Sequence, residues 1–315
     1  MKQRTITGVL ILAIFLPLLL VDALFPIFQG MMILLAGVAA NEMLKMYSSQ
    51  KPMSRTMKGI TIFCSILLYL AALVEWIPRS IPAQGLALFN IHLEILPTII
   101  LITIILFTCT VFSESYDGTD VGKSITTILY TGIGFAAITI LKYLGMRYIV
   151  FLFLITTLTD VFAYLTGMLF GKHKMAPRIS PKKTWEGAIG GTIVATVFGS
   201  VFALLYGVMF GNFFGPAKET LLTGICNTDN LSTGGIATIL VLITILTSII
   251  GQIGDLVASR LKRTYAIKDF GSIFPGHGGV LDRLDSALLA SLFLLSVFKI
   301  LNYLLPLAET VFSII

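Results

Sequence analysis

Long apolar stretches follow one another along most of the chain, with short polar segments between them. A run of about 20 predominantly apolar residues is long enough to cross a bilayer as a helix. Nine such stretches can be delimited, and each predicts a membrane-spanning helix. The predicted spans cover residues 5–25, 28–46, 58–76, 93–113, 123–142, 147–169, 188–210, 235–258 and 284–306. The pattern therefore predicts an all-α, polytopic integral membrane protein.

Composition supports this reading and excludes an ordinary soluble domain. Hydrophobic residues make up 56% of the 315 residues and charged residues 12%, with a mean hydropathy of +0.94. A soluble domain carries about 25% charged residues. We expect about five spans in residues 1–145 and about four in a catalytic region, residues 146–315, with cytosolic loops at 171–187 and 259–283. Together they are expected to form one structural unit.

The distribution of Lys and Arg predicts the orientation. With the N-terminus inside and nine alternating spans, 17 of the 22 Lys and Arg residues lie on the inner side and the remaining five outside. Inner loops of membrane proteins carry such an excess. The C-terminus is then expected outside, in a bacterial inner (plasma) membrane. Because the basic residues follow the inner loops, the net charge of +6 does not indicate nucleic-acid binding.

A polar stripe runs along the eighth predicted span. Its members are three or four residues apart, a spacing that places them on one helix face. The stripe consists of Thr244, Ser248, Gln252, Asp255, Ser259 and Lys262. The sixth span also contains an aspartate, Asp160. Acidic side chains inside membrane helices are costly and usually functional, so both aspartates are candidate site residues.

The segment from Ser259 to Asp285 concentrates charge that is scarce elsewhere. Asp282 and Asp285 lie three residues apart at the start of the ninth span, and His277 lies among glycines. Four cationic side chains accompany them: Lys262, Arg263, Lys268 and Arg283. Converging carboxylates are oxygen ligands that suit Mg²⁺, while cations and glycine-rich backbone suit phosphate. The combination indicates phosphoryl or nucleotidyl transfer at the inner membrane surface.

A second inner loop precedes the seventh span. It reads Ser180-Pro181-Lys182-Lys183-Thr184-Trp185-Glu186-Gly187. Two lysines followed by Thr and Glu at a helix start predict an anion site at a capped helix N-terminus.

These residues resemble the signature of the phosphatidate cytidylyltransferases, also called CDP-diacylglycerol synthases. In order and spacing, the matching residues are Ser259, Lys262, Arg263, Lys268, Asp269, Gly271, Pro275, His277, Gly278, Gly279, Asp282, Arg283 and Asp285. Asp160 and the segment from Ser180 to Gly187 also resemble this family, so the likeness covers roughly residues 150 to 290.

The resemblance implies that CTP and phosphatidate react to give CDP-diacylglycerol and pyrophosphate in phospholipid biosynthesis. It also implies a two-metal centre with Mg²⁺ and K⁺ as the candidate second metal. CTP, phosphatidate and the bilayer are then the partners, and a homodimer is a further candidate assembly.

Site roles follow from the residues and the resemblance together. The expected catalytic residues are Asp255, Lys262, Arg263, Lys268, Asp269, His277, Asp282, Arg283 and Asp285. The expected substrate-binding residues are Ser180, Lys182, Lys183, Thr184, Ser259, Gly278 and Gly279. The expected metal ligands are Asp160, Asp255, Asp282 and Asp285.

Two alternatives stay open at this point. The nearer one is a related CTP-dependent membrane transferase, such as a CDP-archaeol synthase or a polyprenol kinase. The more distant one is an ion-coupled transporter that uses Asp160 and Asp255 as a cation path.

Overall fold

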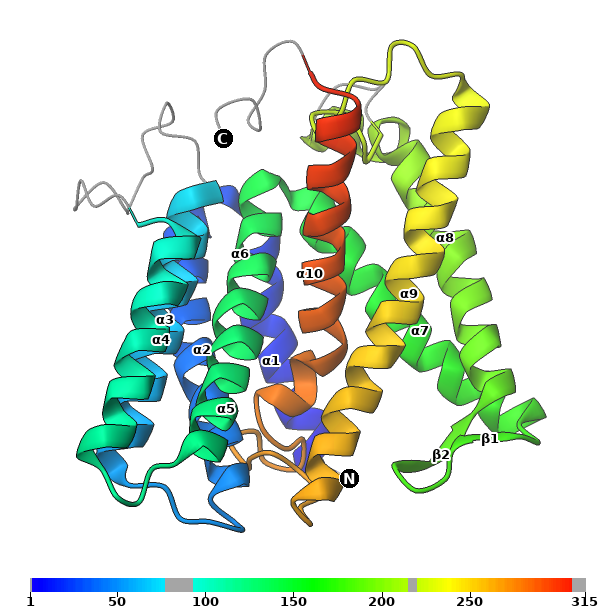
Figure 1. Ribbon diagram of the computed structural model, residues 1–315. Coiled ribbons are helices and arrows are strands. Elements are labelled where there is room, and N and C mark those ends of the chain that lie inside the picture. The colour runs from blue at the N-terminus through cyan, green and yellow to red at the C-terminus, as the bar shows by residue number, and fades with distance from the viewer. Residues whose placement is uncertain (1, 77–92, 215–219, 308–315) are drawn as a thin grey trace. The chain divides into compact units, whose positions relative to one another are not determined.

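A computed structural model of the chain describes residues 2–76, 93–214 and 220–307 (Figure 1). Nearly all regular structure is helical, which confirms the predicted all-α class. The helices and strands are α1 (Lys2–Leu20), η1 (Asp22–Leu24), α2 (Phe25–Tyr47), α3 (Arg55–Trp76), α4 (Ile95–Phe112), α5 (Gly118–Thr127), the π-helical turn η2 (Ile128–Ile133), α6 (Gly134–Leu144), α7 (Met146–Phe170), β1 (Lys174–Ala176), β2 (Ser180–Thr184), α8 (Trp185–Phe214), α9 (Thr233–Thr264) and α10 (Leu281–Leu304).

Each of the nine predicted spans overlaps a helix. Eight helical segments of the described chain are long and apolar enough to cross a membrane, and the apolar part of α1, Thr7–Leu20, is shorter. The segment α5–η2–α6 counts as one of the eight. The chain is therefore a multi-pass membrane protein, while the count of nine and the orientation stay predictions.

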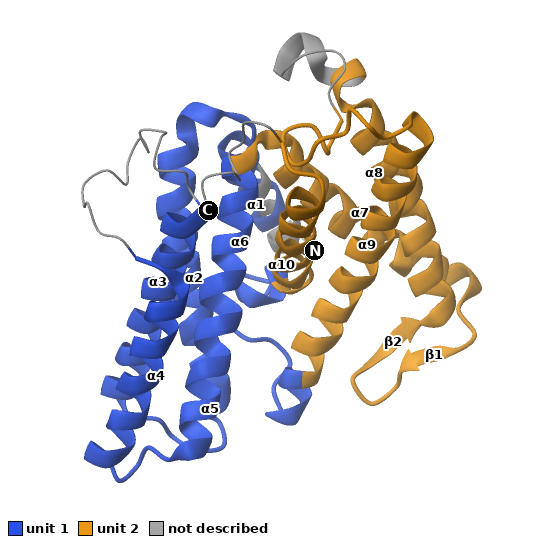
Figure 2. Ribbon diagram, turned by 45° about the horizontal axis from the view of Figure 1, so that its top comes forward, with its two compact units in different colours: residues 1–143, 261–284 blue, residues 144–260, 285–315 orange. Residues whose placement is uncertain are grey.

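The chain divides into two compact units (Figure 2). Unit 1 comprises Met1–Tyr143 and Leu261–Leu284, and unit 2 comprises Leu144–Arg260 and Asp285–Ile315. The chain therefore passes from one unit to the other within α9 and within α10. The predicted division into residues 1–145 and 146–315, as halves of one structural unit, stays a prediction.

Helix α3 and the α5–η2–α6 segment in unit 1 are joined by a buried row of hydroxyl groups. Thr61 bonds Ser124 at 3.1 Å, Ser65 bonds Thr131 at 2.7 Å, and Tyr69 bonds Thr139 at 3.0 Å. Between them the backbones come so close that a Cβ on Gly132 would lie 2.7 Å from the Ser65 carbonyl oxygen. Such small-residue contacts and hydroxyl bonds are typical of helix pairs in membranes.

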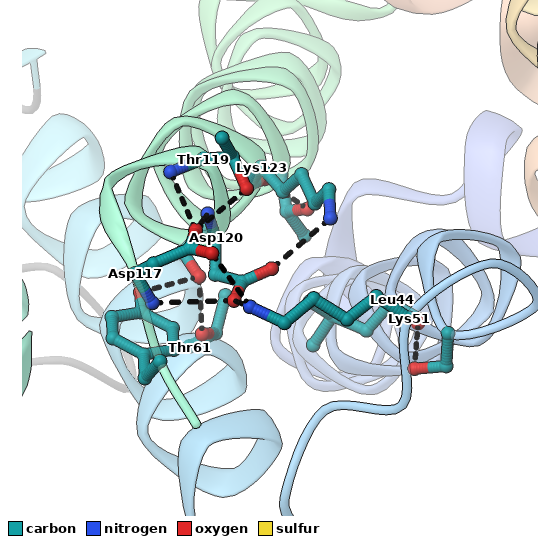
Figure 3. A network of polar contacts seen from close by, with 11 residues as sticks. Leu44, Lys51, Thr61, Asp117, Thr119, Asp120 and Lys123 are labelled. Carbon is teal, nitrogen blue, oxygen red and sulfur yellow. Dashed lines mark hydrogen bonds and ion pairs between the residues drawn. The ribbon is translucent and has the colours of Figure 1, made fainter. Parts of the chain in front are cut away.

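An ion-pair network fixes the connection between α2 and α3 to the start of α5 (Figure 3). The Lys51 ammonium lies 2.8 Å from the Asp117 carboxylate and 2.5 Å from that of Asp120. Lys123 contacts the other oxygen of Asp120 at 3.0 Å. Asp117 and Asp120 also form a capping box on α5, so the same carboxylates satisfy free backbone N–H groups at the helix start.

This network predicts an acid-dependent loss of stability. The Lys51 ammonium and the Thr119 hydroxyl hold the pKa of Asp117 well below its usual range. A lowered folded-state pKa contributes stability that is present above the unfolded value of about 3.9 and is lost as the pH falls through the lower folded value. We expect Lys51→Met to lower the melting temperature at neutral pH, and the difference from the unmodified protein to shrink below about pH 4. Thermal unfolding in detergent as a function of pH measures this, and a difference that stays constant with pH would contradict it.

Candidate functional site

In unit 2, an ion pair joins the hairpin of β1 and β2 to α9. The Lys183 ammonium lies 2.5 Å from the Asp255 carboxylate, and both side chains are about three-quarters buried, with 27% and 28% exposed. The Ser259 hydroxyl, one turn further along α9, donates to Asp255 at 3.3 Å. Lys183 and Ser259, two predicted site residues far apart in sequence, therefore both contact the Asp255 carboxylate.

Asp160 of α7 is close to the same pair. Its carboxylate interacts electrostatically with the Asp255 carboxylate and with the Lys183 ammonium, and it accepts a hydrogen bond from the Ser286 hydroxyl at 3.5 Å. Asp285 accepts from the backbone N–H of Ser286 at 2.8 Å. We refer to Asp160, Lys183 and Asp255 as the carboxylate–lysine cluster.

Hydroxyl and amide groups align the helices that carry this cluster. On α9, Ser248 bonds Thr159 of α7 at 2.8 Å and Thr192 of α8 at 3.2 Å. Gln252 also donates to Thr192, at 2.8 Å. The part of the predicted stripe at Ser248 and Gln252 therefore holds helices together, and the part nearer the C-terminal end of α9 carries Asp255.

The two lysines of the segment from Ser180 to Gly187, Lys182 and Lys183, have different surroundings. The strand β2 was not predicted, and alternate side chains of a strand point to opposite faces. Lys183 faces Asp255, whereas Lys182 is exposed. The hydroxyl of Thr184, a residue only 4% exposed, accepts from the Gly187 N–H at 3.2 Å. The predicted cap of α8 is thereby confirmed, and Ser180 pairs with Ala176 at the turn end of the hairpin.

In unit 1, Asp282 is the centre of the signature segment. Its side chain is 4% exposed, and one oxygen pairs with the Lys262 ammonium at 2.7 Å. The other oxygen accepts from the backbone N–H groups of Phe270 at 2.8 Å and Gly279 at 2.9 Å. Lys262 also lies over the Phe270 ring, 5.1 Å from its centroid. The loop before α10 is therefore held in place by its hydrogen bonds to Asp282.

Glu42 of α2 is a buried carboxylate that sequence reasoning missed. It is 3% exposed and accepts from the backbone N–H groups of Val280 and Leu281, both at 3.0 Å. A Cβ on Gly271 or Gly279 would collide with its carboxylate. Glu42 thus binds the positive end of α10 from another helix, and both glycines are needed to let it approach.

The backbone N–H groups around the glycines are therefore engaged by carboxylates. The sequence predicted that they would approach a phosphate. Here Gly279 donates to Asp282, and the next two residues donate to Glu42. Gly278 has φ +86° and lies against Asp282, a conformation and a clearance that favour glycine. The phosphate-binding role of Gly278 and Gly279 stays a prediction.

The remaining predicted residues of the signature lie around this loop. The buried Nδ1 of His277 has no hydrogen-bonding partner among the described residues, and its ring lies near Gly8 of α1. Arg283 donates to the His277 carbonyl at 2.8 Å. Arg263, Lys268 and Asp269 are exposed. Their charged side chains are accessible to a ligand that arrives from water.

The donor set of the carboxylate–lysine cluster fits Mg²⁺. No group of three or more His, Cys, Asp or Glu side chains in the described residues is arranged to hold a metal ion. Mg²⁺ is, however, commonly held by one or two carboxylates with water and substrate phosphates completing its coordination. Asp160 and Asp255 supply two neighbouring carboxylates. Both oxygens of Asp282 accept from protein donors, and those of Asp255 contact Lys183 and Ser259. The four predicted ligands stay a prediction.

Comparison with known proteins agrees with these features. The model of the cytidylyltransferase family matches residues 2–301. The phosphatidate cytidylyltransferase of Staphylococcus haemolyticus is 36% identical over 287 residues, covering 91% of this chain and 94% of the relative. Those of Staphylococcus saprophyticus and Staphylococcus aureus are 35% and 32% identical, with the same shares covered. A match of this extent includes every predicted site residue, and the chain belongs to the cytidylyltransferase family.

Proposed function

We propose that this protein is a phosphatidate cytidylyltransferase, which transfers the cytidylyl group of CTP to phosphatidate and so makes CDP-diacylglycerol and pyrophosphate. The observation that carries the proposal is the extent of the family match, because residues 2–301 include both the carboxylate–lysine cluster and the signature segment, Ser259 to Asp285. Relatives named for this activity cover 91% of the chain.

The chemistry explains why the site is rich in charge. A phosphate oxygen of phosphatidate attacks the α-phosphorus of CTP, and the bond from that phosphorus to the oxygen bridging to the β-phosphate breaks. Pyrophosphate leaves with the bonding electrons. The nucleophile is already an anion near neutral pH, so no general base is needed. The main obstacle is repulsion between two anionic substrates, which positive charge removes.

Unit 2 supplies one set of groups for this task. The Lys183 ammonium is paired with Asp255, and an incoming phosphate would compete with that carboxylate for the ammonium. Lys182, on the other face of β2, is free to bind a second phosphate. Asp160 and Asp255 would hold Mg²⁺, with K⁺ as the candidate second ion. When bound, Mg²⁺ neutralises phosphate charge and orients the triphosphate.

Unit 1 supplies a second set. Lys262 is oriented by Asp282 and by the Phe270 ring, and Arg263, Lys268 and Arg283 provide further positive charge for phosphate groups. Asp282 acts in this proposal chiefly through Lys262 and the loop. We propose that these groups lie on the cytosolic side of a bacterial inner membrane, where CTP is available. A homodimer stays a prediction.

Release of pyrophosphate by the purified protein tests the proposal. CTP and Mg²⁺ would be supplied with phosphatidate, with an ether-lipid phosphate, or with a free polyprenol, and CDP would be measured beside pyrophosphate because a polyprenol kinase would leave CDP. We expect release with phosphatidate to exceed release with either alternative by at least about 100-fold, the discrimination that a site built for one polar group can reach. Greater pyrophosphate release with the ether-lipid phosphate, CDP formation with polyprenol, or ion flux in proteoliposomes without CTP consumption would replace the proposed activity by one of the two alternatives.

A further inference from the structure

The hairpin of β1 and β2 carries an unbalanced cluster of positive charge. No Asp or Glu occurs between residues 161 and 185. Four exposed cations lie on or beside the hairpin: Lys172, Lys174, Arg178 and Lys182. None of these four side chains forms an ion pair or a hydrogen bond with another residue of the described chain. We call them the cation patch.

The hairpin is held firmly at its base. The Glu186 carboxylate, in the first turn of α8, accepts from the backbone N–H groups of Lys172 at 3.1 Å and His173 at 3.2 Å. It also bonds the His173 ring at 2.6 Å, and the Trp185 N–H donates to the His173 carbonyl at 3.0 Å. Glu186 is therefore already bound to the hairpin backbone and Asp255 is paired with Lys183, and the cation patch keeps its charge.

Exposed apolar side chains border the cation patch. Met168, Leu169 and Phe170 at the end of α7 are 62%, 69% and 66% exposed, and Trp185 at the start of α8 is 53% exposed. In Figure 1 the hairpin extends beyond the ends of these two helices. In a multi-pass membrane protein, helix ends with exposed aromatic residues lie at the level of the lipid headgroups.

We propose that the hairpin is a docking surface for anionic lipid headgroups of the surrounding leaflet. The apolar border sets its depth, and the cation patch then faces the phosphate groups. A Lys or Arg near an anionic membrane surface attracts it, and the attraction falls off within a Debye length. Under the proposed function, the same charges would also concentrate phosphatidate, since its headgroup is an exposed phosphate.

Trp185 offers a direct readout that needs neither CTP nor phosphatidate. The chain has two tryptophans, so Trp76→Phe leaves Trp185 as the sole reporter. The Trp76→Phe variant would be placed in vesicles that contain phosphatidylcholine and phosphatidylglycerol in fixed proportion. In each experiment one of the two lipids is brominated, so that it quenches nearby tryptophan. We expect brominated phosphatidylglycerol to quench Trp185 at least about threefold more strongly than brominated phosphatidylcholine, and high salt to reduce the preference.

Two matched double substitutions distinguish an effect of the hairpin's own charges from an effect of the protein's net charge. In the same background, Lys174→Gln with Arg178→Gln should bring the ratio of the two quenching constants close to one. Arg55→Gln with Lys58→Gln removes one Arg and one Lys outside unit 2 and should leave the ratio unchanged. Equal quenching by both lipids before any charge is removed, or an equal effect of both double variants, would overturn the proposal. Because no substrate is present, these outcomes do not depend on whether the proposed reaction is correct.

Discussion

Glu42→Ala is expected to lower the kcat for pyrophosphate release by at least tenfold, although Glu42 is not a predicted substrate-binding residue. The substitution leaves the N–H groups of Val280 and Leu281 buried without their acceptors. Each unsatisfied buried group costs about 1–3 kcal/mol, and the start of α10 would rearrange to avoid that cost. Asp282 and Arg283 lie in this same turn, so their positions would change with it.

Two further variants make this expectation specific. Glu42→Gln retains one acceptor oxygen, so its kcat should lie between those of the alanine variant and the unmodified protein. Glu75→Ala is the matched control, because Glu75 also accepts from a helix-start N–H, that of Ile95 at 2.7 Å, but α4 carries no predicted site residue. Because Glu75 accepts from one N–H group and Glu42 from two, we expect a smaller destabilisation and an unchanged kcat in the control.

Hydrogen exchange provides an independent measurement of the same contact. The amides of Val280 and Leu281 should exchange faster in Glu42→Ala than in Glu75→Ala, because only the first variant removes their acceptors. If the two variants lost activity equally, the effect would be general destabilisation and Glu42 would have no positioning role.

Asp255→Asn is expected to reduce pyrophosphate release by at least about 100-fold, a loss typical of removing one charge-stabilising group and equivalent to about 2.7 kcal/mol. Asparagine keeps the size of the side chain and an acceptor for Ser259. It removes the negative charge that pairs with Lys183 and that a metal ion would require. The protein should still fold, because the hydroxyl contacts of α9 are unchanged.

Metal binding can be measured apart from turnover by the electron paramagnetic resonance of added Mn²⁺. We expect Asp255→Asn to weaken Mn²⁺ binding at least tenfold, the lower end of what loss of a metal-site group costs. Asp229→Asn, at an exposed loop residue of the same unit, should leave both binding and turnover unchanged. Loss of turnover with unchanged Mn²⁺ binding would assign Asp255 to orienting Lys183 and not to holding metal.

Hydropathy predicted the helices well because a membrane helix satisfies its own backbone hydrogen bonds. A local window of sequence therefore contains most of the required information. The hairpin was missed for the opposite reason. Its strands are three and five residues long, and their pairing depends on contacts with Glu186 and on the cap at Thr184.

The site was predicted in part for related reasons. The spacing along α9 predicted that Asp255 and Ser259 share a face, and they do form a hydrogen bond. Nothing local indicated that Lys183 rather than Lys182 would reach Asp255, because that choice depends on the register of β2. Glu42 was overlooked because its hydrogen-bonding partners lie 238 and 239 residues away in sequence. A buried acid in an early span was the available signal.

The π-helical turn at Ile128–Ile133 allows the number of residues in its span to differ between related chains. The turn accommodates one residue more than an α-helix would at that point. Deleting a single residue there would restore α-helical geometry, and because the extra residue is absorbed within the turn, the following helix would keep its orientation relative to α3. The bond of Thr139 with Tyr69, after the turn, and that of Thr61 with Ser124, before it, would then both be retained. Related chains without this turn are therefore expected to be one residue shorter in this span.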